Sequence, residues 1–191
     1  MTAAYSDAKM YFMDIPMLYG FADNMRFRGA DGIYLFNWFD RLNFYASSQY
    51  QQMLDGGLSA KKTRQSERRY PVCFRNVGPS DAQLPKETDN PVTVRILMGA
   101  TRLESETATL VLGFEKRDGL ESAIFSVSLN GKELGAGAEE KALERLGSNP
   151  ARAVTYSCPL GVLRSGENEM ILRQTVGEKQ RLVWAELRVV P

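Results

Sequence analysis

One apolar run near the N-terminus restricts the folds open to this chain. Residues 32–39, Gly-Ile-Tyr-Leu-Phe-Asn-Trp-Phe, are apolar over most of their length and do not alternate between polar and apolar side chains. This pattern is typical of a parallel strand that helices cover on both faces. Because such a strand needs neighbouring strands, and no similar run occurs elsewhere in the sequence, we expect residues 32–39 to belong to a larger α/β arrangement.

A helix is predicted directly before this run. Asp14 can cap the N-terminus of the helix, and Pro16 is tolerated in its first turn. Apolar residues then recur at spacings of three, four and three, which places them on one helical face: Ile15, Leu18, Ala22 and Met25. Gly29 suits the end of the helix. With a second short helix expected over residues 45–58, we interpret residues 1–58 as one α/β segment.

From Tyr70 onward the pattern is that of an antiparallel β-protein. Asn130-Gly131 is the strongest short hairpin signal in the chain. Six strands are predicted, over residues 92–98, 107–114, 123–129, 154–160, 169–176 and 182–189. A brief helical turn is expected over residues 138–146. Evenly spaced strands with turn residues between them indicate a β-sandwich or jelly roll, which we assign to residues 70–191.

The segment between the two parts, residues 59–69, is polar and basic. It holds Lys61, Lys62, Arg64, Arg68 and Arg69. No aromatic side chains are interleaved with these cations, as the stacking surface of a single-strand binder would require. The formal net charge of +1 adds no overall attraction for a polyanion. We therefore interpret this segment as a solvated connector and expect no nucleic-acid partner.

Composition excludes several kinds of site. Histidine is absent from all 191 residues, so the usual zinc ligand and the commonest general base are missing. A Ser-His-Asp or Cys-His nucleophile cannot be assembled. Asp81, Asp89 and Asn90 lie in one predicted loop but lack the acidic density of a calcium loop. We predict no metal site and no cofactor.

Cysteine usage and hydropathy leave the compartment open. Cys73 and Cys158 each lie in an apolar run and are interpreted as small buried thiols, with one disulfide as the alternative in a secreted protein. No apolar run approaches the length of about 18 residues that a membrane span requires, so we expect no membrane partner.

Two family resemblances rest on these motifs. GADGIYLFNWFD, residues 29–40, resembles the last helix–strand step of the (β/α)8 barrels in bacterial glycoside-hydrolase-like proteins, and the later Arg-Arg-Tyr-Pro-Val segment resembles their exit into a C-terminal β-domain. VSLNGKEL, PLGVLRSGENEMIL and LVWAELRVV resemble parts of galactose-binding-like jelly rolls. Together the resemblances imply a mainly β fold, with a galactose-binding-like jelly roll behind the end of a TIM barrel.

The barrel resemblance points to three site residues. Glycosidic chemistry needs two carboxylates that flank the scissile bond, and in such barrels earlier strands supply them. We therefore predict no catalytic residue in this chain. The C-terminal rim of the last strand would hold Asn37, Trp38 and Asp40 as carbohydrate-contacting residues. The alternatives are core packing for Trp38 and a turn or helix cap for Asp40.

The sequence leaves three functions to compare. The first is a non-catalytic C-terminal portion of a glycoside-hydrolase-like protein, whose sandwich buttresses the barrel and contacts carbohydrate. The second is an independent carbohydrate-binding module, which should present exposed aromatic side chains. The third is a structural or protein-interaction domain without a small ligand.

Particular side chains bear on this comparison. Trp184 is predicted to be a core residue because it lies within an alternating strand. Asn168, Glu178 and Arg181 are interpreted as ordinary surface residues. The apolar strand at residues 33–39 predicts either self-association through the N-terminal segment or docking of that segment on the sandwich.

Overall fold

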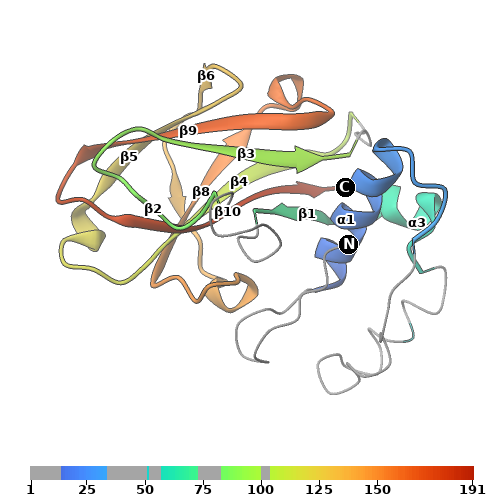
Figure 1. Ribbon diagram of the computed structural model, residues 1–191, viewed down its shortest axis with the longest axis horizontal. Coiled ribbons are helices and arrows are strands. Elements are labelled where there is room, and N and C mark those ends of the chain that lie inside the picture. Colours follow the sequence, from blue (N-terminus) through green and yellow to red (C-terminus); the bar gives the residue numbers. More distant parts are fainter. Residues whose placement is uncertain (1–13, 34–50, 52–56, 73–82, 100–103) are drawn as a thin grey trace.

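Figure 1 shows the computed structural model of the chain, in which two antiparallel sheets pack face to face and helices α1 and α3 lie together at one end. The structure describes residues 14–33, 51, 57–72, 83–99 and 104–191. Within these ranges the chain is mainly β, and the predicted antiparallel β-sandwich is confirmed.

The two sheets differ in how their strands are ordered. In the first sheet the order is β1-β10-β4-β8-β7, and β2 also pairs with β10. Its strands are β1 (Arg68–Pro71), β2 (Lys86–Glu87), β4 (Thr107–Phe114), β7 (Ala138–Glu139), β8 (Arg152–Cys158) and β10 (Arg181–Val190). The second sheet has the order β3-β9-β5-β6. Its strands are β3 (Val92–Met98), β5 (Ile124–Leu129), β6 (Lys132–Glu133) and β9 (Gly166–Val176).

The main core lies between the sheets and follows from strand alternation. In β3 every second residue is buried, and the side chains between them face outward. Met170 and Leu172 of β9 are fully buried beside these residues. Phe114 and Phe125 stack across the core with ring centroids 4.3 Å apart, which joins the two sheets.

Trp184 is buried, as predicted, but on the opposite side of the first sheet. It is 6% exposed and belongs to a second, smaller cluster with Met17, Val111 and Leu146. The 3₁₀ turn η4 (Leu143–Arg145) lies beside this cluster. The part of the outer face of the first sheet around Trp184 is therefore covered by α1 (Ile15–Phe27) and by the loop that contains η4.

Turn residues in the sequence predicted the positions of most elements correctly. Asn130 and Gly131 both have positive φ, of 51° and 82°, as a two-residue hairpin turn requires. Strand β8 begins two residues before the predicted start and ends before Pro159, which has no backbone N–H to donate. The helical turn predicted over residues 138–146 was too long, because Ala138–Glu139 form strand β7 and only Leu143–Arg145 are helical.

Helix α1 forms as predicted. The Asp14 carboxylate caps its N-terminus by accepting a 2.9 Å hydrogen bond from the Met17 N–H. At the other end Gly29 has a φ of +93°, and its N–H donates to the Arg26 carbonyl at 2.9 Å. No helix among the described residues is long and apolar enough to cross a membrane.

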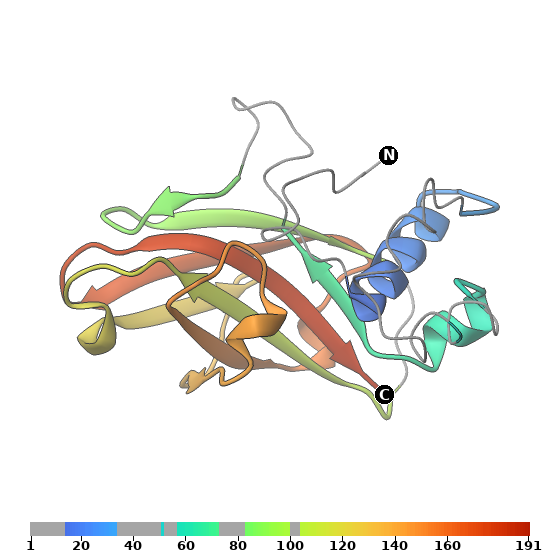
Figure 2. The same cartoon turned by 90° about the horizontal axis from the view of Figure 1, so that it is seen from below.

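The helix packs closely on the sandwich, with α3 (Ala60–Arg64) beside it (Figure 2). It crosses strand β1 at Gly20, where an added Cβ would lie 2.0 Å from the carbonyl oxygen of Arg69. Close approach recurs one turn later. A Cβ on Gly99, which follows β3, would lie 1.9 Å from Oδ2 of Asp23. Two glycines therefore set the distance between helix and sandwich.

The solvated-connector interpretation is wrong for the end of the basic run. Residues 60–64 form α3, and Lys61 and Arg64 are exposed. Arg68 and Arg69, however, lie in strand β1 with no exposed surface. Both guanidinium groups can be buried because carboxylates far away in the sequence neutralise their charges.

We predict that Gly20→Ala lowers stability although alanine favours helices. Intrinsic propensity alone would raise helix stability by about 0.5–1 kcal/mol. The clash with a backbone carbonyl cannot be relieved by rotating a side chain, and overpacking of this kind costs about 1–3 kcal/mol. Urea unfolding followed by far-UV circular dichroism measures the sign. Gly135→Ala is the matched control, because a Cβ there meets nothing within 4 Å. A more stable G20A protein would contradict this packing.

Candidate functional site

The predicted carbohydrate-contacting residues Asn37, Trp38 and Asp40 lie outside the described residues, as do Cys73 and Asp81. Their predicted roles therefore stay predictions. Cys158, the other thiol, is free and buried, and burial raises its pKa to about 12. The described polar residues converge at a different place, the junction between α1 and the sandwich, where strand β1 carries three consecutive buried side chains with polar groups: Arg68, Arg69 and Tyr70.

Arg69 is the centre of this junction. Its guanidinium donates from Nη1 to Asp14 Oδ2 at 2.5 Å, and from Nε and Nη2 to Glu186 Oε2 at 3.0 and 2.7 Å. Neither Arg69 nor Glu186 has exposed side-chain surface. Arg69 Nη2 also donates to the Arg145 carbonyl at 2.7 Å. One side chain thus holds the cap of α1, the middle of β10 and the η4 loop.

The Glu186 carboxylate extends the contacts along β10. It also accepts from Arg188 Nη2 at 2.7 Å, and Arg188 Nη1 donates to Glu140 Oε2 at 3.0 Å. A second branch joins Arg145 Nη2 to Glu67 Oε1 at 2.9 Å. We call this set the junction network, made up of Asp14, Glu67, Arg69, Glu140, Arg145, Glu186 and Arg188. Three guanidinium groups and four carboxylates alternate in it.

Electrostatics favour the charged state at two points of this network. Burial by itself opposes the charge on Arg69, but the carboxylates of Glu186 and Asp14 outweigh it and raise the Arg69 pKa above its ordinary value. Burial likewise opposes the charge on Glu140. The Ala142 N–H and the Arg188 guanidinium outweigh this effect and lower the Glu140 pKa. At Arg69 and Glu140, nearby opposite charges and hydrogen bonds therefore offset the cost of burying a charge.

The neighbouring residues of β1 form a second polar group, because side chains alternate along a strand. Arg68 Nη2 donates to Glu106 Oε1 at 2.6 Å, and neither side chain is exposed. The Tyr70 hydroxyl donates to Asp23 Oδ2 at 2.6 Å, in the middle of α1. Burial, reinforced by the nearby Asp23 carboxylate, raises the Tyr70 pKa well above its usual value, so Tyr70 stays a neutral donor.

The ion pairs of the junction network are suited to holding α1 against the sandwich. Each carboxylate of the junction network lies within ion-pair distance of a guanidinium. Among the residues that the structure describes, no group of three or more acidic or thiol side chains could hold a metal ion. Charged pairs of this kind are costly to break, because removal of one partner leaves the other buried and uncompensated.

Asn168 is a further polar residue that was misjudged from the sequence. It has no exposed surface, so its interpretation as an ordinary surface residue is wrong. Its amide accepts from the Arg164 N–H and donates to the Arg164 carbonyl, both at 2.8 Å. Asn130 of the hairpin turn donates to Asn168 Oδ1 at 2.9 Å. The two asparagines therefore lock loops together, and their polar atoms are occupied.

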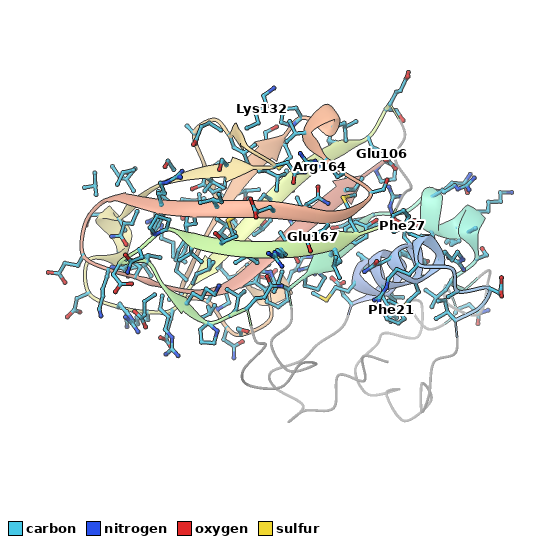
Figure 3. All side chains as sticks on the ribbon, turned by 45° about the horizontal axis from the view of Figure 1, so that its top comes forward. Phe21, Phe27, Glu106, Lys132, Arg164 and Glu167 are labelled. Carbon is cyan, nitrogen blue, oxygen red and sulfur yellow. The ribbon has the colours of Figure 1, made fainter. Side chains whose placement is uncertain are left out.

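Aromatic side chains of the described residues are mostly buried. Tyr19, Tyr70, Tyr156 and Trp184 are each 6% exposed or less. Phe21 and Phe125 are partly exposed, and Phe27 is the most exposed at 45%, where α1 meets the start of β9 (Figure 3). A sugar ring stacks on an exposed aromatic face, so the described part of the sandwich offers little stacking surface.

No family model matches the sequence, and no curated protein matches it. Among solved structures the chain is similar to the crystal structures of BuGH86 in its wild-type form and of a variant of it, both in complex with neoagarooctaose. In each case the identity is 14% and the TM-score 0.45, over 64% of this chain and 18% of that chain. The chain thus spans less than a fifth of the length of these proteins.

We predict that Arg69→Met destabilises the chain far more than Arg95→Met. Loss of one partner from a buried ion pair costs about 3–5 kcal/mol, whereas an exposed pair is worth about 1 kcal/mol or less. Arg95 and Glu167 form such an exposed pair, with 61% and 54% of their side chains accessible. Denaturant unfolding of both variants gives the comparison. An equal loss of unfolding free energy in the two variants would contradict the conclusion that the junction network holds α1 against the sandwich.

Acid should weaken the same junction through Glu140. The pKa of Glu140 is lowered from its ordinary value of 4.5 in the folded state, so Glu140 stabilises the fold above that pH. This contribution is lost as the pH falls below 4.5 and through the lower folded-state pKa. Glu140→Gln should therefore reduce the fall in unfolding free energy on acidification, measured by urea titrations at a series of pH values. Glu144→Gln, at an exposed carboxylate in the same loop, should leave the pH profile unchanged.

Proposed function

We propose that this chain is the non-catalytic C-terminal portion of a glycoside-hydrolase-like protein, in which the β-sandwich buttresses the α/β segment that precedes it. In this proposal the sandwich is a galactose-binding-like jelly roll, and residues 1–58 form the end of a (β/α)8 barrel. The observation that carries the proposal is the buried junction network between α1 and strands β1 and β10.

The character of the junction distinguishes a buttress from a tethered module. Independent modules are joined by exposed, polar linkers that few contacts cross. Here the guanidinium of Arg69 links Asp14 to Glu186, and Tyr70 bonds to Asp23 in the middle of the helix. The glycine contacts at Gly20 and Gly99 bring the two backbones together. The sandwich and helix are therefore packed as parts of one body.

A second buried face of α1 is evidence for a further layer of structure on the side of the helix away from the sandwich. Ile15, Leu18, Tyr19 and Ala22 lie at helical spacing and are each 3% exposed or less. They belong to neither hydrophobic cluster of the sandwich. A helix that is buried on two sides fits the position between a barrel and a supporting domain. We propose that the apolar strand predicted at residues 33–39 belongs to the layer on that side.

Carbohydrate contact is assigned to the segment after α1. Trp184 and the tyrosines of the described sandwich are buried, and the most exposed aromatic side chain among the described residues, Phe27, belongs to helix α1. Asn37, Trp38 and Asp40 are the residues that we propose for contact with a neutral sugar. This assignment disfavours an independent carbohydrate-binding module, whose own aromatic side chains would have to be exposed.

Hydrogen exchange of the full chain tests both parts of this proposal. If the sandwich buttresses the helix, amides of residues 18–22 should exchange as slowly as those of β4 and β10, because they open only on global unfolding. The same measurement with oligosaccharides of galactose, xylose or glucose should slow exchange around residues 37–40.

Two variants make this test specific. Tyr70→Phe removes the bond to Asp23 and should lower protection in α1, whereas Tyr156→Phe, at a buried tyrosine away from the helix, should not. Trp38→Ala should abolish the sugar-dependent change. Rapid exchange of α1 beside a protected sandwich would refute the buttress. Unchanged exchange with every sugar would refute carbohydrate contact alone.

A further inference from the structure

The cations of helix α3 differ from most arginines of the sandwich in how they are paired. Even the exposed Arg95 and Arg173 lie within ion-pair distance of a carboxylate, at 3.5 and 3.8 Å. Lys61, Lys62 and Arg64 of α3 pair with no carboxylate in the part of the chain that the structure describes. We call these three residues the cationic face of α3.

The exposed side of α3 brings two of these charges together. Lys61 and Arg64 are exposed and three positions apart, so their side chains are neighbours on the helix surface. Like charges at this spacing destabilise a helix. Side chains of α3 extend away from the sandwich (Figure 3). Stability therefore does not account for the arrangement, whereas an anion bound from solution would relieve the repulsion.

Two arginines hold α3 in place. Arg26 of α1 donates from Nη2 to the Leu58 carbonyl, just before the helix, and from Nη1 to Thr63 Oγ1 at 3.5 Å. Arg68 of β1 donates from Nη1 to the carbonyls of Thr63 and Arg64 at 3.0 and 3.2 Å. The backbone under the cationic face is thus fixed before a partner binds, which lowers the entropy cost of binding.

The surroundings of the cationic face favour an anionic polysaccharide over other polyanions. Short runs rich in lysine and arginine, such as residues 60–65, are typical of surfaces that bind heparin or nucleic acid. Single-stranded nucleic acid needs aromatic rings for its bases, and a lipid surface takes large apolar side chains beside the cations. Helix α3 exposes neither kind of side chain. The formal net charge of +1 provides no extended positive surface for a duplex.

We propose that the cationic face of α3 binds the sulfate or carboxylate groups of an anionic polysaccharide. Lys61 and Arg64 contact the anionic groups. Gln65, exposed beside them, offers an amide that bonds to sugar hydroxyl groups. The inference does not depend on the proposed function, because the cationic face lies outside residues 37–40.

Isothermal titration of the full chain tests this inference with two probes, heparin for sulfate and polygalacturonate for carboxylate. At least one should bind at low ionic strength, and the affinity should fall as NaCl is added, because salt screens exposed charges. Lys61→Gln combined with Arg64→Gln should weaken binding about tenfold, the order expected for the loss of two exposed ion pairs. Lys61→Arg combined with Arg64→Lys keeps both charges and should bind as the wild type does.

The matched control is Lys132→Gln combined with Arg164→Gln. It removes one lysine and one arginine at exposed positions of the sandwich, both labelled in Figure 3, and so changes the net charge equally. The control should keep wild-type affinity. Equal weakening in both double variants would overturn the proposal, since net charge alone would then account for binding. It would also be overturned if neither probe bound, or if duplex DNA or vesicles of phosphatidylserine and phosphatidylcholine bound as tightly.

Discussion

The ion pair between Arg69 and Glu186 is the interaction on which the arrangement of the molecule depends. Both side chains are fully buried, and a buried charge that loses its partner costs several kcal/mol. Because the same guanidinium also binds Asp14, its full set of ion pairs forms only when the helix cap, strand β1 and strand β10 are all in place. Positions 14, 69 and 186 are thereby coupled, although no contact between them is local in the sequence.

This coupling explains which parts of the fold could be predicted. Strand alternation, the Asn130-Gly131 turn and the cap at Asp14 are local signals, and the elements that they indicate are present. Strand β1 has no such signal, because Arg68 and Arg69 belong to a basic run and their compensating carboxylates are far away. One indication was available. Glu186 lies in a strand among apolar residues, where a charge needs a buried partner.

The polar residues of the loops show the same limit on a smaller scale. Asn168 follows Gly166, whose positive φ turns the chain, and its amide closes that turn by bonding to Arg164. Residue type alone predicts a solvated asparagine, and burial depends on the hairpin that Asn130 brings alongside. In the same way Gln83 is an ordinary polar residue until β3 lies next to it.

The distribution of covered and open surface then determines what the sandwich can contact. Part of the outer face of the first sheet is covered by α1 and the η4 loop, which pack around Trp184. The second sheet is open, and its outer face carries charges of both signs, at Arg95, Glu167, Glu169 and Arg173. Figure 3 shows Glu167 on this open face. Among the described residues, the outer face of this sheet therefore lacks the exposed aromatic rings that sugars stack on. The helix is supported chiefly by β1 of the first sheet, with a further close contact at Gly99, which follows β3 of the second sheet.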